Sequence, residues 1–224
     1  DAQESRGLGD VYKRQVLKSL CESGMEGTTR VIVSSDHGDN QGARGMWNKS
    51  TLYREATNVP MIVAGPDIPQ NHLCHTNVNL IDIGPTVLAS AGLAEDITLP
   101  GRSLLQIARE PDDPQRIGFS EYHAVGSPSA AYMLRQDRWA YHHYVGYEPE
   151  LFDVKADPGQ TINLATSNAH QHICRDLENV LRNQLDPEGT DQKAKFDQDQ
   201  LIKKFGGREK ALSTGVKGAS PAPK

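Results

Sequence analysis

The sequence predicts an α/β fold, followed by a smaller region in which an antiparallel sheet packs against a helix. The first observation is a pair of apolar runs, residues 30–34 and 59–64, whose β-branched residues are typical of buried strands. The second is a helical pattern at residues 80–91, which with the strands gives the alternation of a layered α/β domain. The third is a set of four short strand-like segments after residue 114, which a long amphipathic pattern follows.

The N-terminal residues give little structural signal. Residues 1–15 are polar and aperiodic, and the stretch GLGDVYKRQ resembles translated adapter sequence, so we expect a non-native or disordered leader. From Gln15 a short amphipathic helix is expected, with apolar residues at helical spacing and Gly24 as its stop.

Two further helices are expected in the first part. Residues 49–56 can form a short helix between the two strands. Residues 80–91 carry stronger signals, because Pro85 falls in the first turn, Val87 and Leu88 supply the apolar face, and Gly92 ends the helix.

The second part is expected to be an antiparallel sheet with a helix on one face. Gln136 and Asp137 join two of the strand candidates closely enough for a hairpin. The strand candidates are residues 118–122, 131–135, 139–144 and 151–154, and the helix is residues 168–185. The resulting boundaries are 1–15 for the leader, 16–114 and 115–211 for the two parts, and 212–224 for a tail.

Composition excludes two classes of partner. The 224 residues carry a formal net charge of −5, from 29 acidic and 24 basic residues that are mixed along the chain. Because no basic stripe is present, a nucleic acid is not an expected partner. No apolar run reaches the roughly 18 residues that a membrane span needs, so no membrane span is expected.

The first candidate site is the pair Asp36 and His37, which directly follows the first predicted strand. Ligands of open α/β sheets bind at the carboxyl ends of strands, and a tight turn at Gly38 lets both side chains face one cation. A carboxylate oxygen and an imidazole nitrogen are suitable ligands for a divalent metal. The alternative is an ordinary Asp-Gly turn with a solvated histidine.

A longer motif surrounds this pair. Residues 34–66, SSDHGDNQGARGMWNKSTLYREATNVPMIVAGP, resemble the late metal motif of the sulfatase family, which belongs to the alkaline phosphatase superfamily. In that family a strand and a D-H-G or D-N-G triplet precede a glycine-rich loop, a lysine, an aromatic-acidic pair and a V-P strand. Here the lysine is Lys49, the pair is Tyr53 and Glu55, and the strand begins at Val59. Residues 78–86 and 99–104 resemble two further family segments.

The C-terminal half resembles one subgroup of the family. The segments SEYH at residues 120–123, AYMLR at 131–135 and ELFD at 150–153 are similar to arylsulfatases of the choline-sulfatase and glucuronate-2-sulfatase (arylsulfatase K) kind. The resemblance implies the C-terminal portion of an alkaline-phosphatase-like mixed sheet sandwiched by helices, with a small antiparallel-sheet-and-helix subdomain. Residues 16–114 are then the C-terminal part of a sulfatase catalytic domain.

The resemblance also implies roles for four residues. Asp36 and His37 are implied as ligands of one divalent metal, with calcium preferred and manganese or magnesium as alternatives. Lys49 is implied to contact the sulfate oxygens, where its charge stabilises the transition state. His123 is a candidate for substrate binding, with a structural histidine as the alternative. The implied substrate is a sulfated small molecule or sulfated sugar, and the family is often periplasmic or secreted.

The histidine pair 142–143 is interpreted as structural. Because side chains alternate along a strand, one of the two is expected to face outward.

The sulfatase nucleophile is missing from these residues. Sulfatases use a Cys or Ser in a C/S-x-P-x-R motif, which is converted to formylglycine, and none of the three cysteines lies in such a motif. We therefore expect this chain alone to be inactive as a sulfuric ester hydrolase. Two alternatives stay open: a phosphonate monoesterase or phosphodiesterase of the same superfamily, and a non-catalytic binding fragment.

Overall fold

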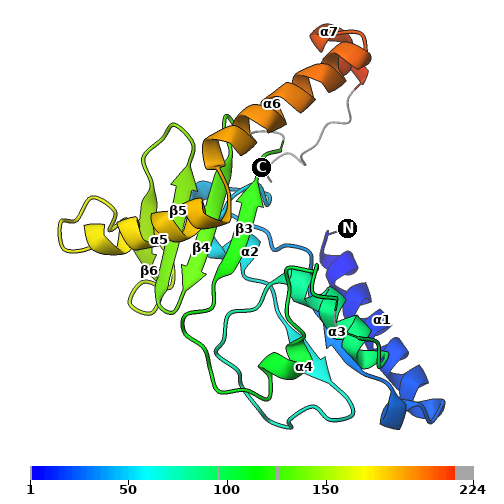
Figure 1. The fold of residues 1–224 in the computed structure, drawn as a ribbon. Helices are drawn as coiled ribbons and strands as arrows, with labels where there is room; N and C mark the ends of the chain where they lie inside the picture. The colour runs from blue at the N-terminus through cyan, green and yellow to red at the C-terminus, as the bar shows by residue number, and fades with distance from the viewer. Residues whose placement is uncertain (1, 95, 125–126, 215–224) are drawn as a thin grey trace. The chain divides into compact units, whose positions relative to one another are not determined.

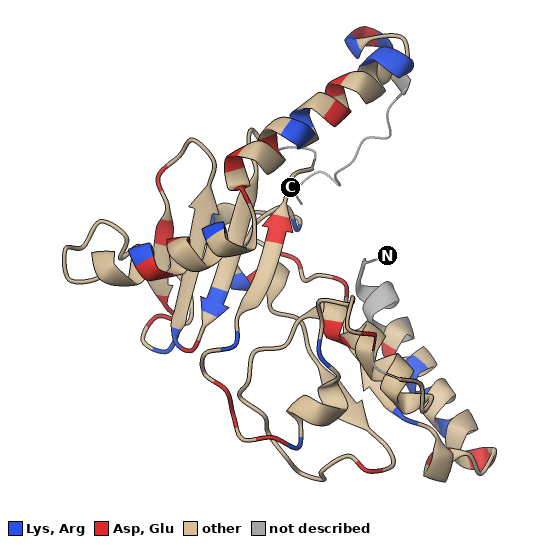
Figure 2. Ribbon diagram, in the orientation of Figure 1, with Lys and Arg blue, Asp and Glu red and all other residues tan. Residues whose placement is uncertain are grey.

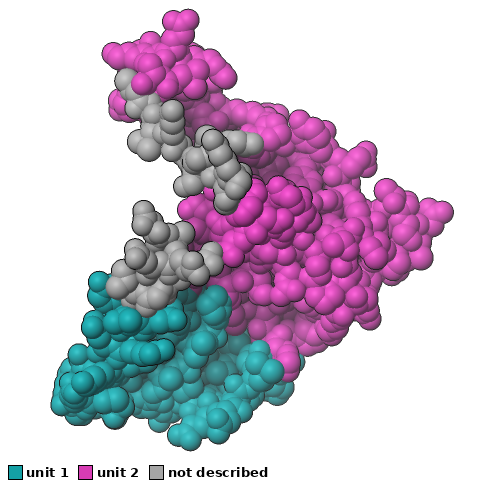
Figure 3. Space-filling model, turned by 180° about the vertical axis from the view of Figure 1, so that it is seen from behind, with its two compact units in different colours: residues 1–34, 60–74, 80–112 teal, residues 35–59, 75–79, 113–224 magenta. Residues whose placement is uncertain are grey.

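A computed structural model describes residues 2–94, 96–124 and 127–214 (Figure 1). The chain divides into two compact units, which Figure 3 colours teal and magenta: the first is residues 1–34, 60–74 and 80–112, and the second is residues 35–59, 75–79 and 113–224. The sequence predicts that residues 16–114 form a single part of the chain. In the structure, the segment 35–59 with all of its candidate site residues belongs to the second unit.

The first unit contains helices and a small antiparallel sheet. Its strands β1 and β2 pair with Val31 opposite Ala64, and they are shorter than the two predicted apolar runs. The helices are α1, α3 and α4, with 3-10 turns η1 and η3. Their bounds are α1 Ala2–Glu22, η1 Glu26–Thr28, β1 Val31–Val33, β2 Ile62–Ala64, η3 Leu80–Asp82, α3 Ile83–Ser90 and α4 Leu104–Ile107.

Helix α1 differs from the expectation, because it begins at Ala2 rather than at Gln15. Most of its residues have good intrinsic helix propensity, and a solvent-exposed helix requires no apolar stripe along its whole length. Whether residues 1–15 are native stays a prediction. The helix expected at 80–91 is confirmed as η3 and α3.

A buried carboxylate organises the first unit. Asp82 is completely buried, and its Oδ1 accepts a hydrogen bond from the backbone N–H of Arg102 at 2.9 Å. Thr86 donates to the carbonyl of Asp82 at 2.6 Å and accepts from the N–H of Leu104 at 2.8 Å. These bonds join the two segments 78–86 and 99–104, whose motifs therefore have a structural role here.

The second unit is built on a four-stranded antiparallel sheet in the order β3-β4-β5-β6. The four predicted strands are confirmed within one residue at each end. The helix predicted at 49–56 is only the short α2, and helices α6 and α7 were not predicted. The bounds are η2 Ala43–Gly45, α2 Arg54–Thr57, β3 Gly118–Tyr122, β4 Ala131–Gln136, β5 Trp139–Tyr144, β6 Glu150–Asp153, α5 Gln171–Gln184, α6 Pro187–Lys204 and α7 Arg208–Thr214.

Both faces of this sheet are covered. Helix α5 crosses one face (Figure 1), where Leu177 and Leu181 pack in a buried cluster with alternate residues of the strands. The other face packs against Leu52 from the loop before α2. Strand residues alternate between the two faces, so Tyr132 and Leu134 lie under α5, whereas Ala131 and Met133 contact Leu52.

Helix α6 is mainly a charged surface helix. Asp186 caps its first turn by accepting from the N–H of Gly189, and Pro187 is the first helical residue. Lysines and aspartates are interspersed along it (Figure 2), with ion pairs four residues apart at Lys193–Asp197 and Lys195–Asp191. Such a helix lacks the apolar periodicity by which a sequence reveals a helix. The part of the predicted tail from residue 215 lies outside the described residues.

No helix in the described ranges combines the length and apolar character needed to cross a membrane.

Truncation of one core leucine should destabilise the second unit. Leu181 is completely buried, so Leu181→Ala should lower the free energy of unfolding by about 2–5 kcal/mol. The matched control is Leu212→Ala, because Leu212 is 73% exposed and should change stability by less than about 0.5 kcal/mol. Urea unfolding followed by circular dichroism measures both. Equal effects of the two substitutions would contradict this description of the core.

Candidate functional site

The turn after β1 is shaped by a close backbone approach at Gly38. Its N–H donates to the carbonyl of Ala56 at 2.8 Å. A Cβ atom at this position would lie 2.0 Å from the carbonyl oxygen of Glu55, which no side chain tolerates. Glycine is therefore required for the chain to turn here, and this turn sets the positions of Asp36 and His37.

The ring of His37 is fixed by its own turn. Its Nδ1 lies 2.8 Å from the carbonyl oxygen of Gly38, and Ser35 Oγ donates to the carbonyl of His37 at 2.8 Å. A carbonyl oxygen can only accept, so Nδ1 carries the proton and Nε2 presents its lone pair. This is the tautomer in which a histidine binds a metal through Nε2.

The carboxylate of Asp36 is held ionised beside this ring. Its side chain is 81% exposed, and its Oδ2 lies 3.3 Å from His37 Nε2. The N–H of His37 donates to Oδ1 at 2.9 Å, and this bond is the main cause that lowers the pKa of Asp36. The positive charge of Lys49 lowers the pKa further. Asp36 therefore presents a free anionic oxygen.

Lys49 completes the group. Its Nζ lies 2.5 Å from His37 Nε2, within hydrogen-bond distance. The structure thus brings together three of the four residues predicted from the sequence: a carboxylate, an imidazole lone pair and an ammonium. Nε2 has a single lone pair, which here accepts from the Lys49 ammonium, so a metal bound by Asp36 and His37 would displace that ammonium and leave it to bind an anion.

Two of these groups fit a divalent metal. Ligand atoms that lie about 2.0–2.6 Å from a metal are about 3–3.5 Å apart when they are neighbours around it, and the Asp36–His37 separation of 3.3 Å meets that requirement. Among the described residues, no group of three or more His, Cys, Asp or Glu side chains is arranged for a metal. Further ligands would have to be backbone, water or groups outside the described ranges.

The loop that carries Lys49 depends on Asn40, a residue that sequence analysis missed. Asn40 is 2% exposed, and both its backbone N–H and its side-chain amide donate to the carbonyl of Asn48. Thr51 Oγ1 donates to its Oδ1 at 3.0 Å. These bonds hold Asn48, one residue before Lys49, and Thr51, two residues after it, so Asn40 positions Lys49. Asparagines are common in turns, and nothing in the local sequence marks this one as buried.

Tyr53 and Glu55 shape the loop through Arg44. The guanidinium of Arg44 forms an ion pair with Glu55 and lies 4.1 Å above the centroid of the Tyr53 ring. Arg44 also donates to the carbonyl of Gly159 at 2.5 Å. Arg44 has a left-handed backbone with φ 52°, which the surrounding contacts maintain.

A partly buried carboxylate ties this loop to the sheet. Glu150 accepts hydrogen bonds from Tyr53 and Tyr144 at 2.8 Å each, and His142 Nδ1 lies 3.3 Å from it. Burial of Glu150 acts to raise its pKa, but the bonds from His142, Tyr144 and Tyr53 outweigh it, and the pKa is lowered. Burial lowers the pKa of His142, so its ring is neutral at pH 7.

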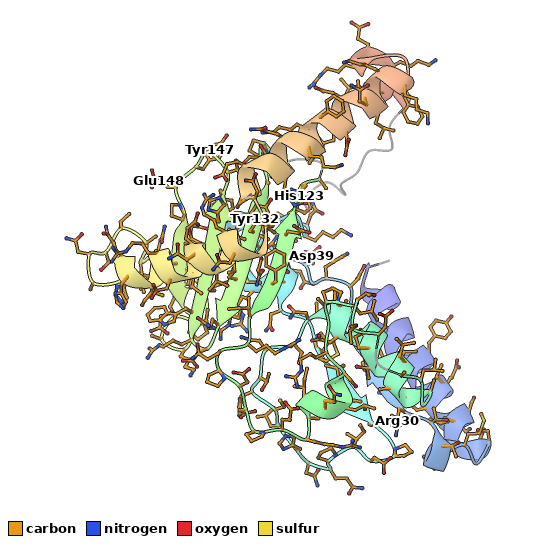
Figure 4. The ribbon with its side chains drawn as sticks, in the orientation of Figure 1. Arg30, Asp39, His123, Tyr132, Tyr147 and Glu148 are labelled. Carbon is orange, nitrogen blue, oxygen red and sulfur yellow. The ribbon has the colours of Figure 1, made fainter. Side chains whose placement is uncertain are left out.

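His123 lies on the other face of the sheet. Its Nε2 is 3.1 Å from a carboxylate oxygen of Glu121, and its ring packs edge-on against Tyr132 at a centroid separation of 5.3 Å (Figure 4). Tyr132 belongs to the cluster beneath α5, and Gln198 of α6 donates to the His123 carbonyl. None of these contacts within the described residues reaches Asp36, His37 or Lys49, and the substrate-binding role stays a prediction.

The histidine pair on β5 corrects one expectation. Alternation holds, since His142 faces Glu150 and His143 Nδ1 lies 3.0 Å from Glu178 of α5 on the other face. Neither faces outward, however, because the sheet is covered on both sides. The His143 side chain is only 12% exposed.

Comparison with known proteins gives a consistent result. The family description "N-sulphoglucosamine sulphohydrolase, C-terminal" matches residues 42–186. Arylsulfatase K of Danio rerio is 30% identical over 180 residues, which is 77% of this chain and 34% of that protein. Choline-sulfatase of Rhizobium meliloti is 33% identical over 156 residues, 67% of this chain and 30% of that protein. The chain thus spans about a third of the length of these relatives.

Solved structures are similar over comparable lengths. A 2-O GAG sulfatase is 31% identical with a TM-score of 0.62, covering 75% of this chain and 37% of that one. A structure in complex with D-glucosamine-2-N,6-O-disulfate is 23% identical with a TM-score of 0.69, covering 83% and 38%. The phosphonate monoester hydrolase of Agrobacterium radiobacter, at 21% identity and a TM-score of 0.65, covers 75% and 37%. The last two likenesses concern the fold alone.

A methyl group at Gly38 should disrupt the site turn. Because a Cβ there would overlap the carbonyl of Glu55, Gly38→Ala should destabilise the second unit by about 1–3 kcal/mol. Gly27→Ala is the matched control, since a Cβ at Gly27 meets nothing within 4 Å. Thermal unfolding followed by calorimetry compares the two variants, and an unchanged Tm for Gly38→Ala would show that the turn does not have this geometry.

The hydrogen bond between Tyr53 and Glu150 predicts that the Tyr53 phenol loses its proton only at strongly alkaline pH. Burial first, and then the bond to Glu150, raise the pKa of Tyr53 from 10.0 to about 12. A raised pKa in the folded state gives stability that is fully present below pH 10 and is lost as the pH rises through about 12. Burial also raises the pKa of Tyr132 to about 12, so phenolate absorbance should show a step near pH 12 whose amplitude falls by about half in Tyr53→Phe. The urea-unfolded chain is the control, and an unchanged amplitude in the variant would contradict the assignment.

Proposed function

The chain belongs to the sulfatase family, through the C-terminal region that the family description matches, and from this premise we propose that it forms the sulfate-binding side of a sulfuric ester hydrolase. One observation supports this proposal above the others. Asp36 Oδ2 and Lys49 Nζ lie 3.3 Å and 2.5 Å from the same atom, His37 Nε2. A group of this kind can bind a metal cation and a sulfate ester side by side.

In the proposed reaction Lys49 binds the sulfuryl group. Its ammonium donates hydrogen bonds to sulfate oxygens, and its charge stabilises the negative charge that builds on them in the transition state. Asn40 and the Tyr53–Glu150 bond reduce the freedom of the backbone on both sides of Lys49. A pre-positioned cation loses less entropy on binding than a free lysine does.

Asp36 and His37 would hold the divalent metal, for which we propose calcium, with manganese or magnesium as alternatives. When bound, the metal supplies Lewis-acid polarisation of a sulfate oxygen. The residues of this chain contribute the ligand geometry. Asp36 stays ionised because of the hydrogen bond from the His37 N–H, and the Gly38 carbonyl fixes the ring tautomer. Both ligands are therefore already in the form that binds metal.

The proposed substrate is a sulfated small molecule or a sulfated sugar. The relatives named arylsulfatase K and choline-sulfatase and the 2-O GAG sulfatase structure support this class. His123 is proposed as a substrate contact on the basis of sequence resemblance. It would act only if a substrate reaches the face of the sheet under α6.

The attacking group of the proposed reaction is not among these 224 residues, because they contain no C/S-x-P-x-R motif. We propose that a formylglycine elsewhere in the protein supplies it. The 224-residue chain by itself should therefore bind a sulfate ester without hydrolysing it.

A substitution at Lys49 tests the proposal. Binding of 4-nitrophenyl sulfate to the chain in calcium-containing buffer should weaken about tenfold or more in Lys49→Ala, because a hydrogen bond to a charged group is lost. Lys18→Ala is the control, since Lys18 is 74% exposed on α1. Calorimetry measures the affinity. Unchanged binding in Lys49→Ala would refute the sulfate site.

Two further results of the same experiment separate the alternatives. Tighter binding of 4-nitrophenyl phosphate than of the sulfate would favour a phosphodiesterase or phosphonate monoesterase. Release of 4-nitrophenol by the chain alone would show that these residues contain a nucleophile, contrary to the proposal.

A further inference from the structure

The distal end of helix α6 and the helix α7 that follows it extend beyond the sheet of the second unit (Figure 1). We call residues 200–214 the α6–α7 tip. Gly206 and Gly207 separate the two helices, and both have a left-handed backbone, with φ 90° and 95°. Their N–H groups donate to the carbonyls of Lys203 and Ile202 at 3.0 Å each. Helices commonly end at such glycines, so these two residues determine where the tip turns.

The tip exposes three large apolar residues to solvent. Leu201, Phe205 and Leu212 are each more than half exposed. Leu201 and Phe205 are four residues apart on α6, so their side chains lie on the same face of the helix. A single exposed apolar residue is ordinary on a protein surface. Several of them on one short segment indicate a surface that binds a partner.

The same segment is basic, although the chain as a whole is acidic with a net charge of −5. The tip contains one acidic residue, Glu209, and the basic residues Lys203, Lys204, Arg208 and Lys210. Figure 2 shows these charges at the distal end of α6 and on α7. Lys203, Lys204 and Arg208 are exposed, and none of them forms an ion pair with another residue of the described ranges. Their charges are therefore available to an anion outside the protein.

Helix α1 provides a contrast on the same chain. It also exposes apolar residues, among them Val16, and it also carries lysines. There, however, Lys13 lies 3.4 Å from Asp10, and Lys18 lies 3.5 Å from Glu22. An anion gains less from a lysine whose charge a neighbouring carboxylate already balances. Helix α1 is therefore the weaker candidate for binding an anion, and it serves as a control.

We propose that the α6–α7 tip binds the surface of an anionic lipid bilayer. Leu201 and Phe205 enter the boundary between the headgroups and the acyl chains, as the apolar face of an interfacial helix does. Lys204 is three residues after Leu201 and therefore flanks the apolar face, from which its long side chain keeps the ammonium among the headgroups.

The combination of apolar and basic residues favours a bilayer over a soluble polyanion. A sulfated polysaccharide would attract the basic residues of the tip, but it offers no hydrocarbon phase to Phe205 and Leu201. A bilayer that contains anionic lipids interacts with both kinds of residue. No residue of the candidate site takes part, so the inference is independent of the proposed function.

Co-sedimentation of the 224-residue chain with lipid vesicles tests this surface. Vesicles of phosphatidylcholine and phosphatidylglycerol in equal parts should bind the chain about tenfold or more tightly than vesicles of phosphatidylcholine alone, and added salt should weaken the binding. The double variant Lys203→Gln/Lys204→Gln should bind the anionic vesicles about tenfold or more weakly, because two basic residues near the membrane surface are lost. Phe205→Ser should weaken the binding about fivefold or more, because the inserted apolar area is lost.

The matched controls are Lys13→Gln/Lys18→Gln and Val16→Ser, which make the same kinds of change on helix α1 and should leave vesicle binding unchanged. All of the substituted residues are exposed, so the variants should stay folded, and circular dichroism checks this. Because the vesicles contain no sulfate ester, this experiment and the Lys49→Ala experiment can fail independently.

Four results would overturn the proposal. The first is equal binding to neutral and anionic vesicles, and the second is an equal loss of binding in the α1 variants. The third is binding to soluble heparin, but not to vesicles, that Phe205→Ser leaves intact, since the partner would then be a polyanion. The fourth is a dimer without vesicles that Phe205→Ser dissociates, since the tip would then bind a second copy of the chain.

Discussion

The carboxylate of Glu150 is the interaction on which the candidate site and its surroundings depend. It lies on β6 and receives hydrogen bonds from Tyr53, four residues after Lys49, and from Tyr144 on β5. A carboxylate that is largely removed from water is costly unless donors surround it, and the two tyrosines together with His142 keep Glu150 ionised. The loop of the site and the sheet of the second unit are joined at this point by the same hydrogen bonds.

The sequence was sufficient to predict those parts of the fold whose signals are local. Strands β3 and β5 are predicted to the residue, because short aromatic-containing segments lie between turn residues that define their ends. Helix α6 was missed because its stability comes from capping and lysine–aspartate pairs rather than from an apolar stripe. The helix expected at 49–56 is mostly loop, since Asn40 bonds Asn48 and Thr51, and Ser50 accepts from Tyr122, in place of helical hydrogen bonds.

The candidate site likewise contains residues that the sequence predicts and residues that only the tertiary structure reveals. Asp36, His37 and Lys49 were predicted from a family motif, and the structure places their functional atoms together. The residues that hold them there could not be predicted, because Tyr53 and Glu150 are 97 positions apart and their pairing depends on the tertiary fold. His123 shows that residues adjacent in the sequence of a strand can lie on opposite faces of the sheet. It follows Tyr122 directly, yet Tyr122 packs against the cluster of Leu52 on one face of the sheet while His123 packs on Tyr132 on the opposite face.

The central claim is that Asp36 and His37 are a preformed pair of metal ligands beside Lys49. Paramagnetic broadening by Mn²⁺ in NMR spectra of the 224-residue chain tests it most directly, because the effect falls steeply with distance from the bound ion. The account predicts that the ring signals of His37 and the amide signals of residues 36–38 broaden first, and that Asp36→Asn removes this effect. Broadening centred on another group of carboxylates, or unaffected by Asp36→Asn, would contradict the claim.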